Sequence, residues 1–163
     1  MNRLAILLAI IVVTGVVGFL ILKHRYSGGP PVRLASSRCD VSLWQHVYER
    51  ERLQVIEECT AVEGRVVKLH EAEDGDLHIA LDPDDKSVLN LLNAVHAKGT
   101  LVVEVVCRHS ATGSTEQAAC RDYQSTVLIP RAGDRVRVTG AYVTDRDNGW
   151  REIHPVSQIE VLH

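Results

Sequence analysis

Apolar residues form two patterns along this chain of 163 residues. The first is one long run, Leu4–Leu22, which contains no charged residue. As a helix that rises about 1.5 Å per residue, this run spans roughly 28 Å, close to the hydrocarbon thickness of a bilayer. It leads directly into Lys23 and Arg25, without the small-residue cleavage site of a secretory signal. The sequence therefore predicts that residues 1–26 are an uncleaved membrane anchor.

The second pattern is an alternation of apolar and polar residues, and it begins after a linker. Residues 27–38 are rich in Gly, Pro and Ser, a composition that does not continue a helix. Alternation on both sides of the turn Glu73–Asp76 favours a β-hairpin from about Ala61 to Asp82. A break in the alternation near Val66 indicates a β-bulge. We expect residues 39–163 to form one small domain that contains this hairpin.

Three more strands and two short helices are expected in the same domain. The strands are Thr100–Cys107, Arg135–Thr144 and a last segment that begins near Trp150. One helix is expected from Asp40 or Ser42 to about Val55, and another over Ser87–Lys98, where Gly99 would end it. The segment between the third and fourth strands, Arg108–Ala119, is expected to be a loop. The predicted fold class is mostly β, with five strands and one or two short helices.

Two sequence motifs resemble those of OB-fold domains. The pattern G-D-x-V-x-V-x-G runs from Gly133 to Gly140, and D-G-D-L-H-I-A-L (74–81) is combined with N-G-W-R-E-I-H-P-V (148–156), as in OB-like domains of bacterial proteins. The resemblance covers roughly residues 59–162 and implies a five-stranded OB-like barrel. OB folds commonly bind oligonucleotides or oligosaccharides on one face, so the resemblance implies a binding or interaction module more readily than an enzyme. It names no ligand, and a protein or glycan partner near the membrane is one expectation.

The charge of the chain is unevenly distributed, which bears on the choice of ligand. Residues 1–38 contain five Lys or Arg and no acidic residue, so 13 basic and 21 acidic residues remain in 39–163, a net charge of −8. Non-specific nucleic-acid binding depends on basic residues that neutralise phosphates. Aromatic residues, which stack on single-stranded bases, are also few. Single-stranded nucleic-acid binding is therefore an alternative that the composition disfavours.

Four cysteines lie in the predicted domain, and they bear on the compartment. Their number is even and no C-x-x-C occurs, which favours two disulfides in an oxidising compartment over a zinc site or buried free thiols. Of the three possible connectivities, we prefer Cys39–Cys59 with Cys107–Cys120, because each bridge closes a short loop. The positive-inside rule would place the domain in the cytoplasm, since more basic residues follow the anchor than precede it. The cysteines lead us to expect an extracytoplasmic domain instead.

Two acid-x-His steps, Asp76 with His78 and Glu152 with His154, are the most specific group of candidate site residues. Side chains alternate along a strand, so each pair shares one face, opposite the apolar residues beside it. If the second and last strands bring these faces together, two imidazoles and two carboxylates suit a divalent metal ion, or a carboxylate orients a catalytic histidine. The simplest interpretation is that both histidines make structural hydrogen bonds. Trp150, after a turn glycine, is expected to be a core residue or an exposed contact.

Other acidic and glycine-containing segments give no support to a known class of enzyme. Asp74/Asp76 and Asp82/Asp84/Asp85 lack the spacing of a complete calcium-binding loop, so we expect solvated turns. The chain contains no P-loop, G-x-G-x-x-G, G-x-S-x-G or H-E-x-x-H motif. We therefore predict no cofactor, and a non-enzymatic role ahead of an enzymatic one.

Overall fold

Five β-strands account for most of the regular structure of the domain. The computed structural model describes residues 39–163. Its strands are β1 (Leu53–Glu71), β2 (Leu77–Pro83), β3 (Leu101–Val105), β4 (Arg135–Asp145) and β5 (Arg151–Val161). The prediction of a mostly-β chain with five strands and few helices is confirmed. The first strand begins earlier than expected, because its first residues pair with β4.

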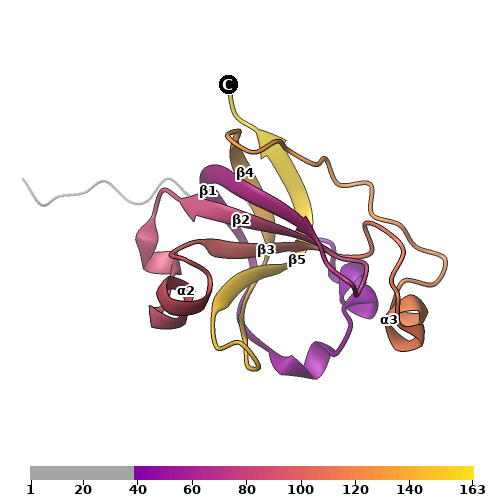
Figure 1. Cartoon of the computed structure of the whole chain (residues 1–163). Helices are drawn as coiled ribbons and strands as arrows, with labels where there is room; N and C mark the ends of the chain where they lie inside the picture. The colour runs from indigo at the N-terminus through magenta and orange to yellow at the C-terminus, as the bar shows by residue number, and fades with distance from the viewer. Residues whose placement is uncertain (1–38) are drawn as a thin grey trace, which may run out of the picture. The chain divides into compact units, whose positions relative to one another are not determined.

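The five strands form one sheet that closes on itself (Figure 1). Their spatial order is β1-β2-β3-β5-β4, and β4 pairs again with β1. All neighbouring strands are antiparallel except β3 and β5, which run parallel. Because β5 lies between β3 and β4, residues from the C-terminal strand lie next to the middle of the chain. This arrangement forms a closed barrel.

The barrel interior is filled by the apolar residues of the alternating strands. In β2, Leu77, Ile79 and Leu81 are buried in the core while His78 and Ala80 face outward. Residues from all five strands contribute to the same cluster, among them Val66, Val103, Val138 and Ile153. The alternation therefore predicted correctly which residues of β2 and β4 are buried in the core, among them Val136 and Val138 of β4.

Strand β1 is long enough to pair with two neighbours. Its first part pairs with β4, and its second part pairs with β2. Near Gly64 it pairs with both strands, Pro83 on one side and Val136 on the other. The register between β1 and β2 shifts between Val66 and Lys68, as the expected bulge near Val66 requires.

The two expected helices are much shorter in the structure. In place of a helix to Val55, the chain makes two 3-10 turns, η1 (Val41–His46), capped by Asp40, and η2 (Arg50–Arg52). The segment Ser87–Lys98 holds only the turn η3 (Lys86–Val88) and the helix α2 (Leu91–His96). The expected loop Arg108–Ala119 contains a further short helix, α3 (Ser114–Ala119). Figure 1 shows α2 and α3 on opposite sides of the barrel.

Two disulfides attach irregular segments to the barrel, and their pairing is the one that we preferred. Cys39–Cys59 fastens the start of the domain to β1, and Cys107–Cys120 closes the segment that contains α3. Beside the second bridge, a smaller apolar cluster packs η1 against β4, with Leu43, Val47 and Val143 at its centre. This N-terminal extension therefore covers part of the outer surface of the barrel.

The predicted anchor 1–26 and linker 27–38 lie outside the described residues. From Cys39 to His163, no helix has both the length and the apolar character needed to cross a membrane.

Candidate functional site

The strand order brings the predicted site residues to one outer face of the barrel, with β3 between the two acid-x-His pairs. We had considered a direct contact between the faces of β2 and β5. The two strands are not neighbours, because β3 lies between them and pairs with both. His78 lies opposite Glu104 of β3, and Ile153 of β5 lies opposite Val103. Glu104 therefore lies between His78 and His154 in a row of polar side chains across three strands.

His154, on β5, lies between carboxylates on two sides. Its Nδ1 atom is 2.8 Å from Glu104 Oε2 and 3.2 Å from Glu152 Oε1. Its Nε2 atom is 3.8 Å from Asp76 Oδ2. The exposed fractions of the four residues are 0% for His154 and Glu152, 1% for Glu104 and 3% for Asp76. Glu104, which we did not predict, thus contacts the histidines of both acid-x-His pairs.

Two further residues complete what we call the buried polar cluster. Arg52 of η2 forms ion pairs with Glu104, at 3.7 Å, and with Asp145 at the end of β4. Asp145 is fully buried and also accepts hydrogen bonds from the turn that follows β4. The cluster consists of Arg52, Asp76, Glu104, Asp145, Glu152 and His154.

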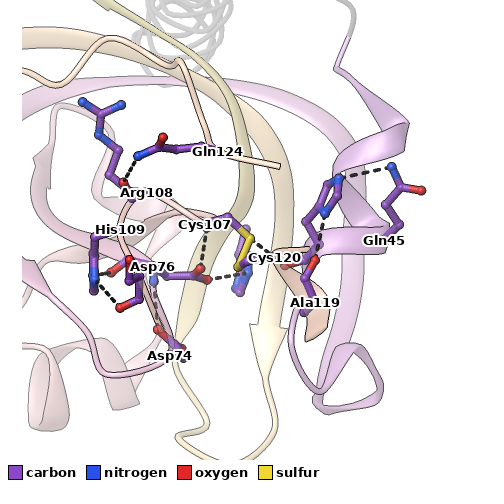
Figure 2. The surroundings of a disulfide bond; sticks show 12 residues. Gln45, Asp74, Asp76, Cys107, Arg108, His109, Ala119, Cys120 and Gln124 are labelled. Atoms are coloured by element: carbon purple, nitrogen blue, oxygen red, sulfur yellow. Dashed lines mark hydrogen bonds and ion pairs between the residues drawn. A yellow bond between two sulfur atoms is a disulfide. The ribbon is translucent and has the colours of Figure 1, made fainter. Parts of the chain in front are cut away.

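Asp76 is buried, which corrects the expectation of a solvated turn at Asp74/Asp76. Its Oδ1 atom accepts a hydrogen bond of 2.8 Å from the backbone N–H of Cys107, directly beside the Cys107–Cys120 disulfide (Figure 2). Asp74 Oδ1 accepts from the Asp76 N–H and fixes the turn. In the other acidic segment, Asp85 caps η3 and Asp84 pairs with Arg135, so these residues do form a surface turn.

Burial and close charges shift the pKa values of the cluster in opposite directions. Burial raises the pKa of Asp76 to about 7, although His154 acts against this. Burial and Glu104 together raise the pKa of Glu152. Burial alone would raise the pKa of Glu104, but His154, His78 and Arg52 lower it to about 2. Burial would lower the pKa of His154, but Glu104 and Glu152 raise it to about 10.

Three buried side-chain atoms at this site lack a hydrogen-bond partner. They are His78 Nε2, Glu104 Oε2 and His154 Nε2, and they are the complete set of such atoms among residues 39–163. Glu104 Oε2 is close to His154 Nδ1, so that contact is an ion pair without the alignment of a hydrogen bond. Leaving a buried polar atom unpaired costs about 1–3 kcal/mol. Their concentration in one place marks this cluster as unusual within the domain.

A groove of about 220 Å³ lies on the barrel surface beside the cluster. It runs over β1, β2 and β3 and is bounded by the end of α2 and by Trp150, from the segment between β4 and β5. We call it the outer groove. No acidic residue lines it, and besides Trp150 its polar side chains are two lysines, three histidines and one threonine: Lys68, His70, His78, His96, Lys98, Thr100.

His78 and Trp150 connect the outer groove to the buried polar cluster. The His78 side chain is 31% exposed, lines the groove, and places Nε2 3.5 Å from Glu104 Oε1. Trp150 is half-buried, lines the groove, and donates its indole N–H to Glu152 Oε2 at 2.9 Å. Trp150 is thus neither a core residue nor a fully exposed one. All five predicted site residues belong to one site, two in the groove and three beneath it.

The residues that we missed carried weaker signals. Glu104 lies within the apolar run T-L-V-V-E-V-V-C, and a glutamate in a buried strand is seldom left without a partner, so it could have been singled out. Arg52, Asp145 and the groove lysines come from distant segments, and only the strand order brings them to this face.

Comparison with known proteins gives no relative for this site. No family model matches the chain, and no curated protein matches it either.

Proposed function

We propose that this chain is a membrane-anchored, extracytoplasmic, OB-like binding module whose outer groove binds an anionic ligand that carries phosphate or carboxylate groups. The observation that carries this proposal is the lining of the groove. Two lysines and three histidines line it, together with Trp150, and no carboxylate does. Cationic and imidazole N–H groups pair well with phosphate and carboxylate oxygens.

The position of the groove supports an OB-like mode of binding. OB folds bind ligands on the face of strands 2 and 3, between the loop that joins strands 1 and 2 and the loop that joins strands 4 and 5. The outer groove lies on β2 and β3, and Trp150 comes from the segment between β4 and β5. The closed five-stranded order is compatible with the same fold class.

The charge of the groove is opposite to the charge of the domain. Lys68 and Lys98 are both exposed in the groove, whereas Glu104 is buried behind His78 and is paired with Arg52 and His154. Carboxylates farther away are screened by salt over about 10 Å. The net charge of −8 still disfavours a long polyanion such as single-stranded nucleic acid, which contacts many sites along its backbone. A small anion, which needs only this local surface, suits the size of the groove better.

Two observations support the membrane-anchored, extracytoplasmic part of the proposal. The run Leu4–Leu22 has the length and composition of a spanning helix. The two disulfides are typical of proteins in oxidising compartments. An anchored domain of this kind would bind its ligand close to the membrane surface.

The test is a titration of the full-length protein in detergent with inorganic pyrophosphate and, separately, with citrate. Tryptophan fluorescence and thermal unfolding are recorded at constant, low ionic strength. We expect saturable binding of at least one of these anions, and at least a tenfold weaker affinity in the double variant Lys68→Ala/Lys98→Ala. Trp150→Phe should remove the fluorescence response, because the only other tryptophan, Trp44, belongs to η1, packs against the smaller apolar cluster and does not line the groove.

The control variant is Lys86→Ala, which removes an exposed lysine that pairs with Asp82 outside the groove. It should bind as the unmodified protein does. The proposal fails if neither anion gives a saturable response, or if Lys86→Ala weakens binding as much as the double variant.

A further inference from the structure

The unpaired buried atoms of the cluster point to a ligand in addition to the one proposed for the outer groove. Glu104 Oε2 and His154 Nε2 both lack a hydrogen bond, and both residues are at least 99% buried. His154 Nε2 faces Asp76 Oδ2 across 3.8 Å, too far for a hydrogen bond. His154 Nε2 thus faces a carboxylate oxygen without a hydrogen bond, while Glu104 Oε2 has ion-pair contacts, to His154 Nδ1 and Arg52, but no hydrogen bond.

The distances between these atoms suit a single ion. One donor atom from each of Asp76, Glu104 and His154 lies within 4.8 Å of the other two. Metal–ligand bonds of about 2.0–2.2 Å allow donor atoms around one ion to be separated by up to about 4.4 Å. Glu104 Oε2 lies 2.8 Å from His154 Nδ1, so its carboxylate must turn toward the Nε2 side of the ring to complete the set. A second group with Asp76 contains Cys107 and Cys120, whose sulfurs are bonded to each other and cannot serve as thiolate ligands.

The charges of the cluster also favour a bound cation. Four carboxylates are buried here, Asp76, Glu104, Asp145 and Glu152. The basic groups that pair with them are the buried His154 and the partly exposed Arg52 and His78. Buried charges are retained when they are paired or when they coordinate a metal. A divalent ion would offset part of this buried negative charge.

We propose that Asp76, Glu104 and His154 bind one divalent transition-metal ion, with His154 Nε2 as the nitrogen ligand. A set of one imidazole and two carboxylates is typical of zinc, manganese and iron sites. This inference does not depend on the ligand of the outer groove.

The surroundings of these three residues resemble the supporting residues of a metal site. A metal-bound histidine almost always donates its other ring N–H to a carboxylate or carbonyl. Here Glu152 Oε1 lies 3.2 Å from His154 Nδ1, and the Trp150 indole N–H holds the other oxygen of Glu152. The Cys107 N–H holds Asp76 Oδ1 and leaves Oδ2 directed toward His154. Glu152 and Trp150 are therefore positioning residues.

The first test is the metal content of the full-length protein, purified in detergent without chelators and measured by elemental analysis. We expect close to one zinc, manganese or iron ion per chain, or one site that fills when Zn²⁺ or Co²⁺ is added to EDTA-treated protein. Co²⁺ bound to nitrogen and oxygen ligands gives visible absorption bands. The spectrum of the unsubstituted protein with Co²⁺ therefore shows whether the ion is bound by such ligands. Bound metal should also raise the temperature of unfolding.

Substitutions identify the ligands. Asp76→Asn keeps an oxygen that can accept from Cys107 N–H but removes the charge, and we expect at least a hundredfold loss of affinity for Co²⁺. Glu152→Gln should cost roughly tenfold to a hundredfold, as is usual for a residue that positions a ligand. His70→Gln removes an exposed histidine of the outer groove and should leave Co²⁺ binding unchanged.

The outcomes separate this inference from the proposed function. A folded protein that takes up no Zn²⁺, Mn²⁺, Fe²⁺ or Co²⁺ overturns the metal site, and so does Co²⁺ binding that Asp76→Asn and His154→Gln leave unchanged. Lys68→Ala/Lys98→Ala should bind Co²⁺ normally even where it no longer binds pyrophosphate. If Asp76→Asn fails to fold, the Co²⁺ spectrum and stoichiometry of the unsubstituted protein still decide the question.

Discussion

At the scale of single residues, Arg52 is the main source of positive charge that the N-terminal extension supplies to the buried polar cluster. It belongs to η2, which precedes the barrel, and it pairs with carboxylates of β3 and β4. Such a pair adds little net stability, because burying its charges costs nearly as much as their attraction returns. Removing only one partner is different, since it leaves a buried charge uncompensated.

Replacing Arg52 with methionine should therefore destabilise the domain by about 3 kcal/mol. The expected loss lies at the low end of the range for broken buried pairs, because Asp145 keeps hydrogen bonds from Asn148 and Asp147 and Glu104 keeps its contact with His154. Urea unfolding of the EDTA-treated protein, followed by far-UV circular dichroism, measures the change.

Arg50→Met is the matched control, in the same turn. Arg50 is exposed and stacks on Trp44, a contact worth about 0.5–1 kcal/mol. Equal losses in the two variants would show that the pairs of Arg52 contribute nothing beyond those of a surface arginine.

Single residues also show which parts of the site could be predicted from the sequence. Asp76, His78, Glu152 and His154 could be singled out because alternation along a strand depends only on local sequence. Glu104 was missed although it completes the row, because its neighbours read as a uniformly buried strand. Which carboxylate lies beside which histidine depends on the pairing of β3 with both β2 and β5, and no local pattern encodes that pairing.

At the scale of elements, the strands were easier to predict than the helices. Side chains alternate between the two faces of a strand, so strands with one face in the core, such as β2, have a strong pattern. The segment 41–55 was expected to be helical, but β1 starts within it because Leu53 and Val55 pair with β4. The disulfide Cys39–Cys59 fastens the same segment at its start. Tertiary pairing thus overrode a weak local preference.

Gly140 marks the place where β4 approaches β5 closely. The register of β4 shifts at this residue, between Thr139 and Tyr142. A Cβ atom here would lie 2.5 Å from the Pro155 carbonyl oxygen and 2.6 Å from Ile153 Cγ2. The glycine in the G-D-x-V-x-V-x-G pattern is therefore required by packing between β4 and β5.

Gly140→Ala should destabilise the domain by about 2 kcal/mol or more, since the methyl group forces the backbones of β4 and β5 apart. Gly113→Ala is the control, because a Cβ atom there meets only the flexible side chain of Glu116. Urea unfolding of both variants makes the comparison, and a loss for Gly140→Ala no greater than that for Gly113→Ala would contradict the packing role.

At the scale of the whole molecule, the charge of the sequence is divided between a basic N-terminal segment and an acidic domain that contains two disulfides. The basic residues of 1–38 flank the apolar run, whereas residues 39–163 carry a net charge of −8. The basic groups of the outer groove thus form a local exception on an acidic domain. Both disulfides lie within the domain, and no free cysteine remains among the described residues.

The two signals for orientation disagree, and the thiol state of the protein in intact cells decides between them. The positive-inside rule would keep the domain in the cytoplasm, where reducing systems hold cysteines as free thiols. We expect the disulfides to reflect the true compartment. A membrane-impermeant thiol reagent should then leave intact spheroplasts unlabelled, and should label the protein after treatment with an impermeant reductant. A variant with serine at all four cysteines gives the background. Labelling that needs no reductant but requires lysis would instead place a reduced domain in the cytoplasm, because only there are free thiols both present and shielded by the membrane.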